Sequence, residues 1–271
     1  MLKDITIGQF FPGNSLIHRL DPRFKIVITF IFIIMLFVGS SPLGLLLGGI
    51  FTVYAITVSR IKLKLFVKSI KPIMPFLIIT AILNLFFISD GDVYFKWRFF
   101  KITSGGIETS IFMIVRIVFL IAGTSLLTYT TSPIALTDAI ERLLSPLKKV
   151  KFPVHELAMM MTIALRFIPT LIEETDKIMS AQKARGAEID SGSLMARAKN
   201  VVSILIPLFI SSFRRAEELA TAMECRCYNG GEGRTRMKQM KLAVRDFVAL
   251  GVTVALLAAV IVLNHYLGHL I

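Results

Sequence analysis

The stretch IVITFIFIIMLFVGSSPLGLLLGGIFTVYAITVS, residues 26–59, decides the fold because it contains no Asp, Glu, Lys or Arg. An uncharged run of this length is typical of membrane-spanning segments. The turn-forming residues GSSP at 39–42 interrupt it. We therefore predict a tight hairpin of two rather short spans.

The composition of the whole chain agrees with a membrane protein. Its 271 residues are 55% hydrophobic, its mean hydropathy is +0.72, and its formal charge of +13 comes from 31 Lys and Arg against 18 Asp and Glu. In a membrane protein such an excess indicates cytoplasmic basic flanks beside anionic lipid, and nucleic acid is not expected as a partner. The first 25 residues lack the apolar core of a signal peptide, so we expect the N-terminus to be retained.

Three further spans follow. Residues 60–71 carry five basic and no acidic residues, which places this linker in the cytoplasm by the positive-inside rule. We predict spans at about 72–89, 107–129 and 247–271, with the mixed-charge loop 90–106 outside. The expected protein is an all-α integral membrane protein of five spans with its N-terminus inside and its C-terminus outside.

Residues 131–245 form the cytoplasmic part in this interpretation. They contain 18 Lys and Arg and 12 Asp and Glu, with no uncharged stretch long enough to cross a bilayer. Apolar residues recur every three or four positions from Val154 to Gln182 and again from Leu194 to Met223, which predicts two long amphipathic helices. A shorter helix precedes them, with Ser132 as its N-cap and Pro133 at its first position. The expected division is 1–130, 131–245 and 246–271.

The two amphipathic helices share two features. Each contains an Ile-Pro step, so we predict kinks at Pro169 and Pro207. Each also finishes near an arginine between compact residues: Arg185 between Ala184 and Gly186, and Arg226 between Cys225 and Cys227. One interpretation is a solvated charge at a helix C-terminus, which suits the helix dipole. The other is a helix tip that inserts into a groove of a partner, and the repetition favours it.

Arg116 lies inside the fourth predicted span, where an ionisable side chain is a functional hypothesis by default. We favour a structural role, with Glu108 or Asn84 as candidate partners. No metal site is expected: His265 and His269 lack an accompanying acid, and Cys225 and Cys227 lack a second pair of ligands. The glycine-rich residues 229–236 lack the spacing of a phosphate-binding loop. We expect no enzyme active site.

Four stretches together resemble the transmembrane T component of energy-coupling factor transporters, the family that includes the cobalt and biotin transport T proteins. They are PGNSLIHRLDPRFK at 12–25, YTTSPIALTDAIERLLSPLKKV at 129–150, LRFIPTLIEETDKIMSAQKARGAEID at 165–190 and AMECRCYNGGEGRTRMK at 222–238. Their order and spacing cover nearly the whole chain.

The resemblance implies a non-catalytic scaffold in the cell membrane that joins two ABC-type ATPases to a small substrate-capture subunit. It implies that the long helices are coupling helices whose Ala-Arg-Gly ends dock in ATPase grooves. Ala184, Arg185 and Gly186 match that tripeptide, whereas Cys225, Arg226 and Cys227 keep only the arginine. Loss of the glycine puts the helix-ending geometry there in doubt. ATP and Mg would be used by the partners, and this chain would bind no cofactor.

Other functions remain as alternatives. Besides a vitamin importer with exchangeable capture subunits, the chain could serve a dedicated cobalt or nickel importer. A self-sufficient secondary transporter should show inverted repeats and several ionisable residues at mid-membrane, but only Arg116 fits that pattern. A membrane-anchored nucleic-acid protein is disfavoured because the helix stripes are apolar rather than basic.

Overall fold

The computed structural model describes residues 10–88, 92–97, 100–186, 194–230 and 242–267. The chain divides into two compact units. The membrane unit holds the described residues within 8–136 and 239–271, and the coupling unit holds those within 137–238.

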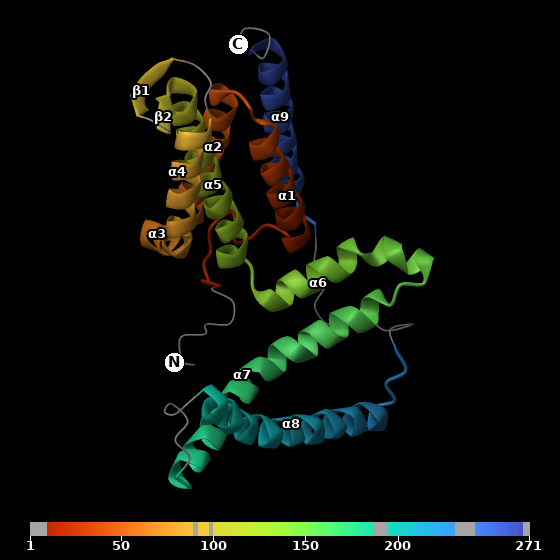
Figure 1. Ribbon diagram of the computed structural model, residues 1–271. Coiled ribbons are helices and arrows are strands. Elements are labelled where there is room, and N and C mark those ends of the chain that lie inside the picture. Colours follow the sequence, from red (N-terminus) through yellow and green to blue (C-terminus); the bar gives the residue numbers. More distant parts are fainter. Residues whose placement is uncertain (1–9, 89–91, 98–99, 187–193, 231–241, 268–271) are drawn as a thin grey trace. The chain divides into compact units, whose positions relative to one another are not determined.

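The membrane unit is a bundle of helices that lie side by side (Figure 1). Its elements are α1 (Pro22–Val38), α2 (Pro42–Ser59), α3 (Leu63–Ile70), the 3₁₀ turn η2 (Lys71–Ile73), α4 (Met74–Phe87), α5 (Ser104–Thr130) and α9 (Val244–Leu267). Helix α1 packs against α9, α5 and α2, and α4 packs against α5. The bundle therefore brings the first and last helices of the chain together.

Among the residues that the structure describes, five helical segments are long and apolar enough to cross a membrane: Pro42–Ser59, Leu63–Phe87, Ser104–Thr130, Val154–Ala184 and Val244–Tyr266. Four of them coincide with predicted spans. Helix α1 has 17 residues, the lower end of the range of about 17–25 that spans a bilayer. We assign α1 as the remaining span because it packs along α9. Val154–Ala184 meets this criterion through its apolar first half, whereas its second half carries the charged residues Glu173, Glu174, Asp176 and Lys177.

Capping residues explain where the spans begin. Asp21 caps α1 by accepting a hydrogen bond from the Arg23 amide, and Pro22 takes the first helical position. Ser41 caps α2 in the same way, with its hydroxyl 3.2 Å from the Gly44 amide and with Pro42 following it. A proline at the first position loses no helical hydrogen bond and has the right φ already. The sequence GSSP thus both ends α1 and starts α2.

A short hairpin lies between α4 and α5, where the sequence predicts only a loop. Strand β1 (Val93–Trp97) pairs antiparallel with β2 (Phe100–Thr103). Thr103 then caps α5, its hydroxyl lying 3.2 Å from the Gly106 amide. In the described part of the chain, this hairpin is the exception to a helical architecture, and the predicted all-α membrane fold is confirmed.

The interior of the membrane unit is small compared with its apolar exterior. Its main core cluster consists of Phe32, Met35, Leu36, Leu45 and Val260, contributed by α1, α2 and α9. Many large apolar side chains point outward instead, and Phe30, Phe37, Phe76 and Phe87 are 59–80% exposed. An apolar exterior of this kind is stable in lipid rather than in water.

Small residues allow the helices to approach closely. A Cβ added at Gly123 of α5 would collide with the ring of Phe32, and one added at Gly49 of α2 would collide with the ring of Phe119. Since lipid is as apolar as the helices themselves, association in a bilayer depends on such close packing.

The coupling unit is built from two long helices. Helix α6 (Pro133–Leu143) spans the boundary between the units and is capped by Ser132, whose hydroxyl accepts a hydrogen bond of 3.3 Å from the Ala135 amide. The 3₁₀ segment η3 (Ser145–Val150) leads into α7 (Val154–Ala184), and α8 (Leu194–Cys225) follows. Helices α7 and α8 pack against each other.

Candidate functional site

The first predicted tip is the C-terminus of α7. The helix ends at Ala184, and the Arg185 amide still donates a hydrogen bond of 3.2 Å to the Ala181 carbonyl. Gly186 follows with φ +84°, and its amide donates to the Lys183 carbonyl at 3.0 Å. A residue in the left-handed region at this position ends a helix while satisfying its last carbonyls. Arg185 is therefore exposed at the C-terminal end of the long helix α7.

The second predicted tip is the C-terminus of α8. The helix ends at Cys225, Arg226 follows it, and Cys227 has φ 53°. The Cys227 amide donates to the Glu224 carbonyl at 2.8 Å and the Tyr228 amide to the Met223 carbonyl at 3.0 Å. These two bonds define a Schellman motif. Arg226 is therefore exposed at a properly terminated helix.

The two tips consequently share one backbone geometry. Arg185 and Arg226 each precede a residue in the left-handed region, Gly186 in one case and Cys227 in the other. The sequence left the second ending in doubt because a cysteine replaces the glycine. The helix ends there with the same geometry, and the backbone of Cys227 is strained because a residue other than glycine has a positive φ.

Polar contacts join α7 and α8 where the two helices cross. Gln182 donates to the Ser203 carbonyl at 3.3 Å, and Arg215 lies 3.9 Å from a Glu174 carboxylate oxygen. In Figure 1 the C-terminal ends of α7 and α8 lie on opposite sides of this crossing. Pro169 and Pro207 both lie inside continuous helix, and the kinks expected there remain a prediction.

One side of α8 carries a continuous apolar surface. Its members are three adjacent pairs spaced four residues apart, followed by Phe213, and they are 48–65% exposed: Val201, Val202, Leu205, Ile206, Phe209, Ile210 and Phe213. The rings of Phe209 and Phe213 lie 4.6 Å apart between centroids. A contiguous exposed apolar surface indicates an interaction site. We call these seven residues the α8 apolar face.

The second tip has an anchor that sequence reasoning missed. The Tyr228 hydroxyl lies 3.4 Å from Nε2 of His155, and Nδ1 of the same ring lies 3.1 Å from a Glu141 carboxylate oxygen. His155 is in the first turn of α7 and Glu141 is in α6. The chain after Arg226 is thus connected to the start of the first coupling helix. Glu141 precedes His155 by 14 residues and Tyr228 follows it by 73. Contacts over such separations leave no periodic pattern in the sequence.

A second set of missed residues surrounds the start of α1. The Asp21 carboxylate accepts two hydrogen bonds from the Arg23 guanidinium, at 3.0 Å from Nε and 2.8 Å from Nη2. The Asp21 amide in turn donates to Asp246 of α9 at 2.9 Å, and Asp246 is fully buried. Asp21 and Arg23 belong to the stretch DPR at 21–23, which is part of a stretch used for the family resemblance. No sequence pattern around Asp246 indicates its role.

Lys25 joins two of the stretches on which the family resemblance rests. Its buried ammonium donates to the Thr130 carbonyl at 2.9 Å, the Thr131 hydroxyl at 3.1 Å and the His18 carbonyl at 3.3 Å. Three acceptors match the three N–H groups of an ammonium. Lys25 thus connects the end of the stretch 12–25 to the start of the stretch 129–150.

Arg116 lies in the middle of α5 and caps another helix. Its Nη2 donates to the Gly39 carbonyl at 2.7 Å, and its guanidinium lies 4.7 Å from the centre of the Phe112 ring. Gly39 ends α1, so its carbonyl has no partner within that helix. The partner is thus a backbone group and not Glu108 or Asn84. This geometry favours the structural role.

Two sequence features fall partly outside the described residues: His269, and positions 231–236 of the glycine-rich stretch. Among the residues that are described, no three His, Cys, Asp or Glu side chains are grouped so that they could hold a metal ion.

Comparison with known proteins identifies the family. A family model described as cobalt transport protein matches residues 13–237. The chain is 58% identical to the energy-coupling factor transporter transmembrane protein EcfT of Clostridium kluyveri, over 92% of this chain and 93% of that protein. It is 54% identical to EcfT of Ruminiclostridium cellulolyticum, over 98% and 99%. It is 47% identical to EcfT of Bacillus subtilis, over 95% and 98%. The expected resemblance is confirmed, and the chain belongs to the EcfT/CbiQ family, the transmembrane components of energy-coupling factor transporters.

Proposed function

We propose that this chain transmits the movements of two ABC-type ATPase subunits to a small membrane subunit that captures the substrate. The matching tips of α7 and α8 support this most strongly, because each presents an exposed arginine on a terminated helix. A guanidinium offers five donors in a rigid fork, which suits a groove lined by carbonyls or carboxylates. Two tips with one geometry suit two related partners. ATP and Mg are bound by those partners, and this chain contributes no catalytic group.

The length of the two helices suits mechanical transmission. At about 1.5 Å per residue, the 31 residues of α7 and the 32 of α8 are each roughly 45 Å long. Because the two helices contact each other, displacement of one tip moves a packed pair rather than a loop. The α8 apolar face then offers the capture subunit a surface that moves with the tips.

We assign the coupling unit and the N-terminus to the cytoplasm and the C-terminus to the outside. The five basic residues at 60–71, directly after the second span, support this orientation. The two cysteines of the chain, Cys225 and Cys227, are both exposed and provide a probe. A membrane-impermeant maleimide should label them in inside-out vesicles and leave them unlabelled in intact cells. Labelling in intact cells would show that the chain has the opposite orientation in the membrane.

The substrate is a vitamin delivered by exchangeable capture subunits in this proposal. A dedicated cobalt or nickel importer is the second candidate, and the description of the matching family model supports it. Identification of the capture subunit that copurifies with the tagged chain, followed by measurement of its ligand, separates the two.

Charge reversal at the tips tests the coupling role. Tagged wild type should bring down two ATPase subunits and support uptake, and Arg185→Glu combined with Arg226→Glu should abolish both. Arg214→Glu is the control, because Arg214 is an exposed arginine of α8 away from its end. The proposal fails if wild type binds no ATPase, or if the double reversal leaves assembly and uptake unchanged.

A further inference from the structure

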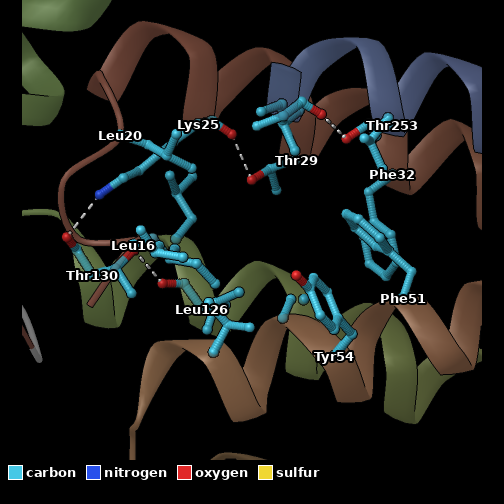
Figure 2. Close-up of a pocket in the computed structure, with 18 of the residues that line it drawn as sticks. Leu16, Leu20, Lys25, Thr29, Phe32, Phe51, Tyr54, Leu126, Thr130 and Thr253 are labelled. Atoms are coloured by element: carbon cyan, nitrogen blue, oxygen red, sulfur yellow. Dashed lines mark hydrogen bonds between the residues drawn. The ribbon is translucent and has the colours of Figure 1, made fainter. Parts of the chain in front are cut away.

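A cavity of about 700 Å³ lies inside the membrane unit, among α1, α2, α5 and α9. The segment containing Leu16 and Leu20 lies at one end of it, and Phe32 and Phe51 lie at the other (Figure 2). The cavity is open to the surroundings, since Leu16 is 67% exposed and Tyr54 is 64% exposed. Its volume is within the range of about 300–1,000 Å³ typical of ligand sites.

The wall of the cavity offers little to a polar ligand. The hydroxyl groups of its threonines donate to carbonyls of their own helices, Thr29 to Lys25, Thr52 to Gly48, Thr130 to Leu126 and Thr253 to Ala249, at 2.7–2.8 Å. Figure 2 shows three of these bonds, together with the one from Lys25 to Thr130. A hydroxyl has a single proton to donate. A polar substrate would therefore lose its hydration without replacement.

Positive charge is confined to one end. Lys25 and Arg245 are the charged residues among the described ones that line the cavity, and both lie in the first turn of a helix, α1 and α9 respectively. The ammonium of Lys25 already has three acceptors. Arg245 is exposed and lies at the rim. A ligand that matches this lining combines an apolar part with an anionic group at one end.

The lining of the cavity suits an acyl chain, which is thin and flexible and can follow an irregular apolar wall. The helices that form the opening are surrounded by lipid, so membrane lipid is also the most abundant molecule at this position.

We propose that this cavity binds an acyl chain of an anionic phospholipid whose phosphate is held by Arg245. The site would bind lipid whether or not the ATPase subunits and the capture subunit are present. A bound lipid fills space between α1 and α9 on one side and α2 and α5 on the other, and so stabilises the bundle that carries the coupling helices.

Native mass spectrometry of the full chain tests this. The chain is released from nanodiscs that contain equal amounts of phosphatidylglycerol and phosphatidylcholine, and retained lipid is counted. Wild type should keep one phosphatidylglycerol. Ala55→Phe and Ala249→Phe, which fill the cavity, should lose it, whereas Ala258→Phe should keep it because Ala258 is an exposed residue of α9 that does not line the cavity.

Arg245→Gln separates the head group from the chain. This substitution leaves the apolar packing intact and should lower the preference for phosphatidylglycerol over phosphatidylcholine about fivefold. The proposal is wrong if the filling variants retain as much lipid as wild type, or if wild type retains both lipids equally. It is also wrong if binding of a co-expressed capture subunit displaces the lipid, because the cavity would then be a socket for that subunit.

Discussion

The backbone amide of Asp21 donates a buried hydrogen bond of 2.9 Å to the carboxylate of Asp246, 225 residues away in the sequence. The second oxygen of Asp246 accepts from the Ala243 amide at 2.8 Å. One carboxylate thus caps the start of α9 and ties it to the start of α1. Since α9 follows the coupling unit in the sequence, this contact anchors the chain where it re-enters the membrane unit.

Replacement of Asp246 should destabilise the protein. Asp246→Ala leaves the Asp21 amide buried without an acceptor, which costs about 1–3 kcal/mol. The thermal midpoint of the detergent-solubilised chain should fall in Asp246→Ala. It should fall less in Asp246→Asn, because asparagine keeps one side-chain oxygen as an acceptor. An Asp246→Ala variant as stable as wild type would show that the contact contributes nothing.

His18 should make stability dependent on pH. Burial lowers the pKa of His18 below 6.5, the nearby Lys25 charge lowers this pKa further, and the hydrogen bond to the Phe11 carbonyl opposes both. In the neutral ring, Nε2 donates to Phe11 at 3.0 Å and Nδ1 accepts from the Ser15 hydroxyl at 2.7 Å.

Protonation of His18 opposes folding because the folded state binds this proton less tightly than the unfolded chain does. The stabilisation is fully present above pH 6.5 and is lost as the pH falls through the lowered pKa of the folded state. The thermal midpoint should therefore drop between pH 7.5 and pH 5.5 more in wild type than in His18→Asn. An equal drop in both proteins would exclude His18 as the titrating group.

Cys227 should tolerate glycine and reject valine. A non-glycine residue in the left-handed region costs about 1–2 kcal/mol, and a β-branched residue fits it worst. Hydrogen exchange at the Cys227 and Tyr228 amides should slow in Cys227→Gly and accelerate in Cys227→Val. Cys225→Val is the matched control, because Cys225 is the last helical residue of α8. Equal exchange in both valine variants would contradict the role of the left-handed residue.

The α8 apolar face should bind the capture subunit. Phe209→Asp would place an unpaired charge in that contact and should weaken capture-subunit binding about tenfold or more. ATPase binding should persist, because Phe209 is about five helical turns from Arg226. Thr221→Asp, an exposed charge insertion on the same helix, serves as control. Capture-subunit binding unchanged in Phe209→Asp would assign this face to another contact.

The spans and both amphipathic helices were predictable because each depends on a local pattern, an uncharged apolar run for the spans and an apolar repeat of three or four residues for the amphipathic helices. The uncharged residues 26–59 with GSSP in the middle predict α1 and α2, and capping by Ser132 follows from Ser-Pro before an apolar pattern. The helical structure of 63–70 was missed, since its basic residues indicated a linker.

Contacts between distant residues were not predictable from one sequence. Arg116 donates to the backbone carbonyl of Gly39, and Asp246 accepts from the backbone amide of Asp21. Every residue has a backbone carbonyl, and nearly every residue has an amide, so the sequence does not indicate which one a side chain will bind. The left-handed backbone of Cys227 was equally hidden, because cysteine has no intrinsic preference for it. Tertiary context, rather than local propensity, determines all three.

In the proposed function, each of the two arginine tips holds one ATPase subunit. Native mass spectrometry of the complex assembled on Arg185→Glu, on Arg226→Glu and on the double variant counts the bound ATPase subunits directly. Wild type should carry two, each single variant one and the double variant none, with Arg214→Glu equal to wild type. Two ATPases retained by the double variant would show that the arginine tips do not hold them.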